Sequence, residues 1–392
     1  MHVFRRLACA VFLLAFVARA SASADPSVEA QRVIDRALDY LKTQQQPDGS
    51  WQREKDPPAI TALVLRAFVL DEKYDSKTDF VARGYDRLLS FQMEAGGIYK
   101  DLLANYNTAI AVSALAAADD PAFRPAIDRA VAFLKVLQWT PAMTSAEGET
   151  VTGESDPWFG GWGYGGRSRG KGRPDLSNAS VALDALRDAG LKPEDPAFQN
   201  ALKFVTRLQN SSETNDAAWA GDDGGFVYGP SDTRQGESMA GEYTDASGRR
   251  LLRSYGSMTY AGLKSMVYAG LTKDDPRVRA AWRWISGNWT LDENPGMRLN
   301  EPEMAQHGLY YYYLTLARAL NAYDEPVIVA PSGDKHDWRV ALIAKLKSLQ
   351  REDGSFSGDK RWMEENPVLV TAYVVQALHE ARADLKQHPP AE

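Results

Sequence analysis

One pattern of residues recurs six times along this chain. Each copy has a charged amphipathic helix, a Gln, a Gly-containing turn with an aromatic residue, and then an almost uncharged helix. The first copy passes through Gln45 and Asp48-Gly49-Ser50-Trp51, and the last through Gln350 and Asp353-Gly354-Ser355-Phe356. The copies between them hold Gln92 with Gly96-Gly97-Ile98-Tyr99, Gln138 with Gly160-Gly161-Trp162, Gln209 with Gly224-Gly225-Phe226, and a degenerate form at Trp284 to Trp289. A repeat constrains the fold more than any single residue, because each unit buries its apolar face only against its neighbours.

The two helices of each unit differ in kind. Residues 80–91, 125–135 and 199–208 carry charges on one face and apolar groups on the other, which is typical of half-buried surface helices. Residues 108–117 and 368–378 are apolar nearly all round, and such a helix must be covered on every side. Six inner helices enclosed by six outer ones satisfy both demands.

Closure into a ring is favoured over an open superhelix of helix pairs. Open superhelices have shorter periods, roughly 34 to 47 residues, and need polar capping repeats at their ends. Here the later periods stretch through two long Gly-rich insertions, and the terminal copies are the best preserved. Prolines precede the expected inner helices, at Pro57-Pro58, Pro174, Pro302 and Pro367. The sequence therefore predicts an all-α fold, an (α/α)6 toroid of six helix-pair repeats.

The pattern resembles the prenyltransferase and squalene-cyclase repeat superfamily. The signature from Gln45 to Trp51 and from Gln350 to Phe356 is similar to that family's Gln-Trp motif, in which Gln and the aromatic residue tie one repeat to the next. The resemblance covers essentially the whole chain after residue 24 and implies the same toroid. It says far less about activity, because function depends on sites and not on folds.

Residues 1–24 have the features of a secretory signal peptide. Arg5 and Arg6 precede an apolar run from Leu7 to Val17, and Ala22-Ser23-Ala24 forms a small-residue cleavage site. The run is too short to span a bilayer. We therefore expect an exported protein, periplasmic or extracellular, whose residues 25–392 form one toroid domain and a monomer. Cleavage would also remove Cys9, the only cysteine.

The charge balance limits the partners. The chain has 45 Lys and Arg against 52 Asp and Glu, a net charge of -7. This acidity argues against nucleic-acid binding and against stable attachment to an anionic membrane. We expect a small-molecule or glycan ligand in the central cavity.

Inner-helix N-termini are the first place to look for a site. In a toroid these ends meet at one mouth of the cavity, and each carries unsatisfied N–H groups. Asp175, Asn178, Tyr255 and Tyr260 lie at two such starts. The alternative is that Asp175 and Asn178 are ordinary helix caps.

Basic residues end both insertions. Arg167, Arg169, Lys171 and Arg173 close residues 140–174, and Arg253 closes residues 211–254. Both clusters precede neighbouring inner helices, so we expect them at the same mouth, where they would bind the anionic head of a ligand. A solvated Gly-rich loop is the alternative reading.

The family comparison predicts no metal and no cofactor. Protein prenyltransferases place basic residues and Asp-x-Cys at one inner-helix start and a His at a later one, which together bind zinc and diphosphate. Here the stretch from Arg169 to Ser177 is similar, but Ser177 replaces the cysteine, so a thiol-activating zinc site is not expected. The Asp-x-Asp-Asp-Thr acid motif of the cyclases is also absent from the sequence.

His307 and the tyrosines after it are the remaining candidates. His307 precedes four consecutive tyrosines, 310–313, which point in different directions along a helix, so one or two must line the cavity. A His at this place suits general acid or base catalysis near neutral pH, and Tyr311 suits contact with the reacting group. A structural role for both is the alternative.

Three functions remain open. The resemblance implies an enzyme or binding protein for an isoprenoid, or another hydrophobic ligand with an anionic head. The second candidate is a carbohydrate-active lyase or hydrolase, for which the 10 Trp and 17 Tyr would supply sugar platforms. The third is an envelope scaffold that keeps the ring without the chemistry. Asp175, His307, Tyr260 and Tyr311 are the predicted catalytic residues, and the basic residues with Asn178 and Tyr255 the predicted ligand-binding ones.

Overall fold

Twelve α-helices make up about half of the part of the chain that the computed structural model describes, residues 25–142, 148, 150–165, 172–230 and 238–389. The helices are α1 (Pro26–Thr43), α2 (Ala59–Val69), α3 (Asp79–Leu89), α4 (Ala104–Ala117), α5 (Arg124–Val136), α6 (Leu176–Asp188), α7 (Pro196–Thr206), α8 (Gly256–Tyr268), α9 (Pro276–Gly287), α10 (Leu309–Tyr323), α11 (Trp338–Leu349) and α12 (Pro367–Gln387). Four short 3₁₀ helices are η1 (Pro121–Phe123), η2 (Met297–Leu299), η3 (Pro302–Gln306) and η4 (Arg361–Met363). Two antiparallel hairpins pair β1 (Glu242–Thr244) with β2 (Arg250–Leu252), and β3 (Val327–Val329) with β4 (Lys335–Asp337).

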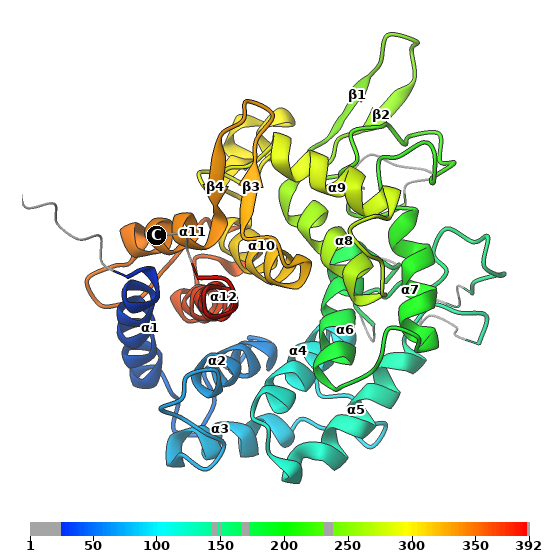
Figure 1. Cartoon of the computed structure of the whole chain (residues 1–392). Coiled ribbons are helices and arrows are strands. Elements are labelled where there is room, and N and C mark those ends of the chain that lie inside the picture. Colours follow the sequence, from blue (N-terminus) through cyan, green and yellow to red (C-terminus); the bar gives the residue numbers. More distant parts are fainter. Residues whose placement is uncertain (1–24, 143–147, 149, 166–171, 231–237, 390–392) are drawn as a thin grey trace, which may run out of the picture.

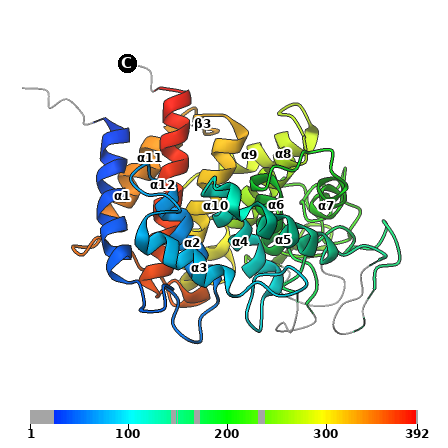
Figure 2. The same cartoon turned by 90° about the horizontal axis from the view of Figure 1, so that it is seen from below.

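The helices form two concentric rings (Figures 1 and 2). The even-numbered helices α2 to α12 are the inner ring, and each packs against the next until α12 returns to α2. The odd-numbered helices lie outside them, and α1 packs against both α11 and α12, so the first and last repeats meet. The predicted (α/α)6 toroid is confirmed.

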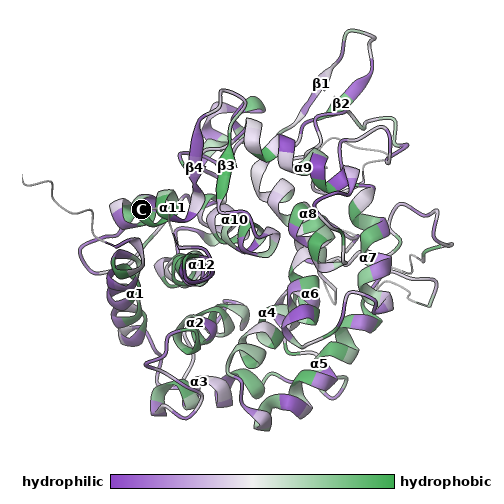
Figure 3. Cartoon of the chain, viewed as in Figure 1, coloured by the Kyte–Doolittle hydropathy of each residue, from purple (hydrophilic) through white to green (hydrophobic). Residues whose placement is uncertain are grey.

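Burial follows the two kinds of helix that the sequence predicts. Residues 59–68 of the inner helix α2 are all buried, whereas the outer helix α1 buries only one face. Figure 3 shows the hydrophilic residues concentrated on outer helices such as α1, α5 and α7. The apolar inner helices are thus covered on the outside by the amphipathic ones.

The repeated Gln joins each repeat to the next outer helix. In the first copy, Gln45 Nε2 donates to Gly49 O at 2.9 Å, in its own turn, and to Phe80 O at 2.6 Å, on α3. The same two bonds recur at Gln92, Gln138, Gln209 and Gln350. In the last copy the second bond runs from Gln350 Nε2 to Val33 O at 2.9 Å, back on α1, and closes the outer ring. We call each such pair of bonds a Gln clasp.

A glycine makes room for each clasp. Gly49 and Gly354 both have φ of +88°, and an added Cβ would lie 2.5 Å from Arg83 O and 2.3 Å from Arg36 O respectively. Gly96, Gly160 and Gly224 meet the next outer helix in the same way. A side chain at these positions would push neighbouring repeats apart.

A threonine links the turn to the inner helix of the same repeat. Trp51 N donates to Thr61 Oγ1 at 2.8 Å, and Ile98, Phe226 and Phe356 use Thr108, Thr259 and Thr371 in the same way. Together the turn, the clasp and the threonine fix where the inner helices α2, α4, α8 and α12 begin.

The degenerate fifth copy has no Gln clasp. Asn288 stands in the Gln place, and its side chain donates only to Trp284 O of its own helix, at 2.8 Å, among the residues that the structure describes. The β3–β4 hairpin fills the connection between α10 and α11 at this side of the ring (Figure 1). Five of the six junctions are therefore clasped.

None of the described helices is both long and apolar enough to cross a membrane. The signal peptide predicted for residues 1–24 lies outside the described residues.

Gly354→Ala tests the clasp that closes the ring. The alanine would adopt an unfavourable positive φ and would place its Cβ against Arg36 O, so we expect the free energy of unfolding to fall by about 3 kcal/mol or more. Urea denaturation followed by circular dichroism measures the loss.

Gly333→Ala is the matched control, because Gly333 has φ of +91° and nothing within 4 Å of an added Cβ. Only the backbone strain applies there, about 1 to 2 kcal/mol. Equal losses in the two variants would contradict a role for the contact between repeats.

His379 makes the stability of the contact between the first and last repeats depend on pH. It lies on α12, which packs against α1 and α2, and its Nε2 is buried with no partner among the described residues. Burial lowers the pKa of His379 to about 4, which outweighs the opposite effect of Asp71. The unfolded chain, with a pKa near 6.5, binds the proton first, so this contribution to stability is complete above about pH 6.5 and falls as pH drops towards 4.

His379→Gln should remove that dependence. We expect the parent to lose up to about 2 kcal/mol relative to the variant between pH 7 and pH 4, because glutamine does not titrate there. Urea denaturation of both proteins across this range gives the difference, in which all other titrating groups cancel. A difference that stays constant with pH would contradict the assignment.

Candidate functional site

The centre of the toroid holds a small cavity of about 30 Å³. All six inner helices contribute to its wall, which nine polar and four apolar residues line. The polar part consists of Arg66, Tyr106, Ser113, Asp184, Lys264, Tyr311, Thr315, Arg318 and Tyr373. Leu63, Ile110, Val181 and Leu314 form the apolar part.

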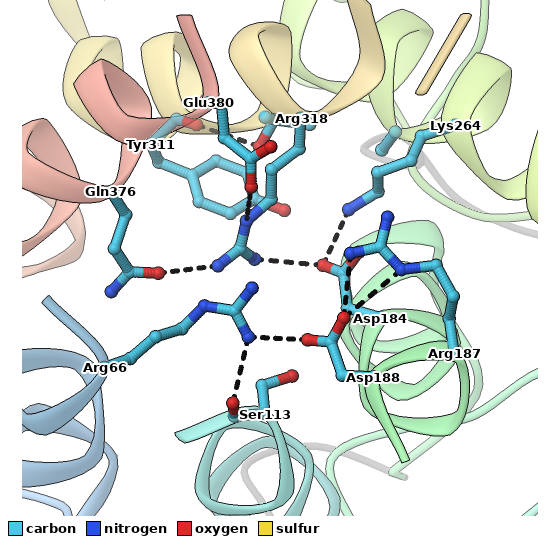
Figure 4. Close-up of polar contacts among 12 residues, drawn as sticks. Arg66, Ser113, Asp184, Arg187, Asp188, Lys264, Tyr311, Arg318, Gln376 and Glu380 are labelled. Carbon is cyan, nitrogen blue, oxygen red and sulfur yellow. Dashed lines mark hydrogen bonds and ion pairs between the residues drawn. The ribbon is translucent and has the colours of Figure 1, made fainter. Parts of the chain in front are cut away.

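Each inner helix places one polar residue at the same level of the ring. These residues stand between the eighth and the tenth position of their helices, about two turns from the N-terminus. They are Arg66, Ser113, Asp184, Lys264, Arg318 and Gln376, which we call the polar belt (Figure 4). Arg187, Asp188 and Glu380 extend it by one turn.

Asp184 is the centre of the bonds in the belt. Its Oδ2 accepts from Lys264 Nζ at 2.7 Å and from Arg318 Nη1 at 3.1 Å, so one carboxylate joins α6 to α8 and α10. Arg318 Nη2 also donates to Gln376 Oε1 at 2.6 Å, and Gln376 Nε2 donates to Leu63 O at 2.9 Å. These bonds carry the belt from α6 to α12 and on to α2.

Arg66 completes the circle. Its Nη1 donates to Ser113 O on α4 at 3.0 Å and to Asp188 Oδ2 on α6 at 2.5 Å (Figure 4). Side chains from α2, α6, α8, α10 and α12, with a carbonyl of α4, are thus connected across the middle of the ring.

Positive charge is in excess at this level. The belt and its extension hold four cationic side chains, Arg66, Arg187, Lys264 and Arg318, and three acidic ones, Asp184, Asp188 and Glu380. Burial raises the pKa of Asp184, but Lys264 and Arg318 outweigh it and hold that pKa below its usual value. Burial lowers the pKa of Lys264 despite its bond to Asp184. The Asp184 carboxylate therefore stays ionised.

Several polar atoms of the belt are buried without a partner among the described residues. They include Arg66 Nε and Asp184 Oδ1, whereas Arg318 Nε makes no hydrogen bond but lies 3.9 Å from Glu380 Oε1. Buried donors and acceptors in native proteins are nearly always satisfied by protein groups, water or ligand. These atoms come from residues that line the cavity, so a polar occupant of the cavity would satisfy them.

A second polar group lies at the N-terminal ends of the inner helices. Asp175 caps α6, and its carboxylate accepts from Asn178 N at 2.8 Å and from Asn178 Nδ2 at 2.7 Å. The capping role that the sequence left open is thus present. Burial raises the pKa of Asp175 to about 6, although Asn178 and Tyr228 bond to it.

Two predicted tyrosines lie next to this group. Tyr311 lines the cavity, and Tyr255 precedes α8 and is 3% exposed. Burial first, and then the proximity of Tyr311 and Asp175, raise the pKa of Tyr255. The structure therefore brings together four of the predicted residues, Asp175, Asn178, Tyr255 and Tyr311.

The other predicted residues lie apart from the cavity wall. The Tyr260 ring packs edge-on against Tyr312, with 5.6 Å between the centroids. His307 stands before α10, where its Nε2 is 3.6 Å from Asp359 Oδ1.

Two of the predicted basic residues are described. The Arg173 guanidinium lies 5.1 Å from the centre of the Trp158 ring. Arg253 donates to Glu242 O and lies over the Tyr243 ring, at the β1–β2 hairpin. Arg167, Arg169 and Lys171 lie outside the described residues.

Sequence reasoning missed the belt. The signal was present, because Arg66, Lys264 and Arg318 are each the single charge of a mostly buried helix, and Asp184 is a charge in the buried part of α6. A charge in a helix that is covered on all sides has to meet another charge or a ligand. Among the described residues, no cluster of three His, Cys, Asp or Glu side chains is suited to a metal ion.

Comparisons with known proteins identify the fold alone. Neither a family model nor a curated protein matches the chain. The type II terpene cyclase MstE from Scytonema shares 14% identity, with 91% of this chain and 100% of that chain covered and a TM-score of 0.53. A variant of it was solved with its substrate, geranylgeranyl dihydroxybenzoate.

Two carbohydrate-active enzymes are equally similar. A family 76 glycoside hydrolase from a bovine Bacteroides thetaiotaomicron strain has 10% identity over 92% of this chain and 79% of that chain, with a TM-score of 0.55. An unsaturated glucuronyl hydrolase specific for heparin has 11% identity over 92% and 98%, with a TM-score of 0.54. The chain therefore shares the α/α-toroid fold with enzymes of both classes.

Asp184→Asn tests the arrangement of the belt. The substitution leaves Lys264 and Arg318 buried and facing each other without their shared carboxylate, which should cost about 3 to 5 kcal/mol of unfolding free energy. Lys264→Met leaves Asp184 paired with Arg318, so we expect a clearly smaller loss. Urea denaturation of the two variants compares them, and equal losses would contradict Asp184 as the centre of the belt.

Proposed function

We propose that this chain binds an organic anion in its central cavity. The carboxylate or phosphate of the ligand would lie at the polar belt, and the rest of the ligand would extend past Tyr311 towards Tyr255 and Asp175. The supporting observation is the buried, unpartnered Nε atom of Arg66 on the cavity wall that it shares with Arg318. Guanidinium N–H groups in a site of excess positive charge suit an oxyanion.

The size of the cavity limits what enters the belt itself. About 30 Å³ accommodates a few water molecules or one carboxylate-sized group, not an isoprenoid chain or a sugar ring. The larger part of the ligand would have to lie between the belt and the N-terminal ends of the inner helices. There it would displace the side chains of Tyr106, Tyr311 and Tyr373. Tyr106 and Tyr373, whose hydroxyl oxygens are 3.3 Å apart, form that part of the wall.

Two ligand classes share the required anion. The solved complex of MstE with geranylgeranyl dihydroxybenzoate supports an isoprenoid acid, and the toroid of the glucuronyl hydrolase supports an acidic sugar. Asp175 favours a catalytic role with either class. A buried carboxyl with a pKa of about 6 exchanges protons near neutral pH, as a general acid or base must.

Arg66→Lys and Arg318→Lys test the anion site. Lysine keeps the charge but removes the Nε–H group, so we expect each variant to bind the ligand at least about tenfold more weakly. The assay is a calorimetric titration of residues 25–392 with isoprenoid acids and diphosphates in one arm and uronic acids in the other.

Arg187→Lys is the matched control, because Arg187 belongs to the same network but does not line the cavity. Thermal melting of each variant without ligand separates weaker binding from loss of structure. If neither ligand class binds the parent, the chain is the scaffold that the sequence left open, and the proposal fails.

A further inference from the structure

A second pocket lies in the outer ring, on α9. It has a volume of about 260 Å³ and lies between the N-terminal half of α9 and the segment that follows α7. Three arginines and two hydroxyl side chains contribute to its wall. The lining residues are Ser211, Glu213, Thr214, Pro276, Arg277, Arg279, Ala280 and Arg283.

The pocket lies at one of the two clasps that lack an arginine present in the other three; the second is the Gln138 clasp, where Asn200 holds that position. In three clasps, the residue third after the clasped carbonyl is an arginine that donates to the oxygen of the clasp Gln. These arginines are Arg83, Arg129 and Arg36, beside Gln45, Gln92 and Gln350. In the Gln209 clasp the clasped carbonyl belongs to Arg277, and the equivalent position is Ala280.

Glycine contacts confirm this equivalence. An added Cβ on Gly49, Gly96 or Gly354 would meet the carbonyl of the arginine, and one on Gly224 would meet Ala280 O at 2.4 Å. Ala280 therefore occupies the arginine position, and its short side chain leaves the space that an arginine fills elsewhere.

Two polar atoms here have no partner among the described residues. Gln209 Oε1, which accepts from an arginine in the equivalent clasps, is buried in a residue that is 0% exposed. Thr214 Oγ1, on the pocket wall, is also buried and unpartnered. A hydroxyl group of a ligand in the pocket would satisfy Thr214 Oγ1, whereas Gln209 is not among the lining residues.

The charges of the pocket are positive, in contrast to the chain as a whole. Arg279 and Arg283 are exposed, one helical turn apart, and form no hydrogen bond or ion pair with any described residue. Arg277 is paired with Asp275, and Glu213 is the one acidic side chain on the described wall. The whole chain has a net charge of -7, so the cluster is a local feature.

We propose that this pocket binds a sulfate or phosphate ester on a hydroxylated molecule. Two guanidinium groups one turn apart match the several oxygens of a tetrahedral dianion, which two forks contact together. The ester group would lie between Arg279 and Arg283, with the hydroxyl groups of its carrier towards Thr214. This site is independent of the central cavity.

The first test is calorimetric titration of residues 25–392 with inorganic sulfate, inorganic phosphate, a sulfated monosaccharide, a phosphorylated monosaccharide and the unsubstituted sugar. We expect saturable binding of the esters, weaker binding of the inorganic ions and none of the plain sugar. Arg279→Gln/Arg283→Gln should weaken ester binding by at least about tenfold. Arg32→Gln/Arg298→Gln, a pair of exposed arginines elsewhere, should leave it unchanged.

Ala280→Arg is the decisive variant, because it adds a positive charge and removes none, and at the same time fills the space. The new side chain should donate to Gln209 Oε1, as in three other clasps, so we expect ester binding to disappear while the melting temperature stays at or above that of the parent. Arg318→Lys in the central cavity should not change ester binding. Absence of saturable binding to the parent, equal weakening in the two arginine pairs, or full binding by Ala280→Arg would each overturn the proposal.

Discussion

The Gln clasp is the interaction on which the whole ring depends. One amide nitrogen donates two hydrogen bonds, one inside its own turn and one to the next outer helix, so neither repeat satisfies the amide alone. A buried amide without its partners costs about 1 to 3 kcal/mol. Because the bond from Gln350 reaches Val33, the last repeat is completed by the first, and the stability of each unit depends on the closed ring.

Closure has a consequence for the centre of the molecule. Six helices that begin at equivalent turns bring their eighth to tenth residues to one level, where any polar side chain is removed from water. Asp184, Lys264 and Arg318 offset part of that cost by pairing across the ring. Cations remain in excess, which supports the proposal of an anionic ligand more than that of an apolar chain.

The repeat made the fold predictable, while the site was predictable only in part. The spacing of Gln, Gly and apolar helices implies two rings, because each of these features can be recognised within a single repeat of the sequence. The sequence could place Asp175, Asn178, Tyr255 and Tyr311 near one another because helix starts can be recognised from sequence, and their role in a site stays a prediction. Lys264 and Asp184 were missed because their pairing, 80 residues apart in sequence, depends on the relative rotation of two helices. Ala280 does not stand out in the sequence, and it becomes informative only because three other clasps have an arginine at the equivalent position.

The junction between α9 and α11, which has no clasp, should be the place where the ring deforms most easily. Among the described residues Asn288 bonds only within its own helix, so outward pressure from the centre meets less resistance here than at the five fastened joints. In a ring with six equal clasps all junctions would move by similar amounts, whereas in this ring the movement should concentrate at the junction that has no clasp. Entry of anything larger than the resting cavity should therefore widen the molecule on one side, beside α10, and leave the opposite half of the toroid nearly rigid.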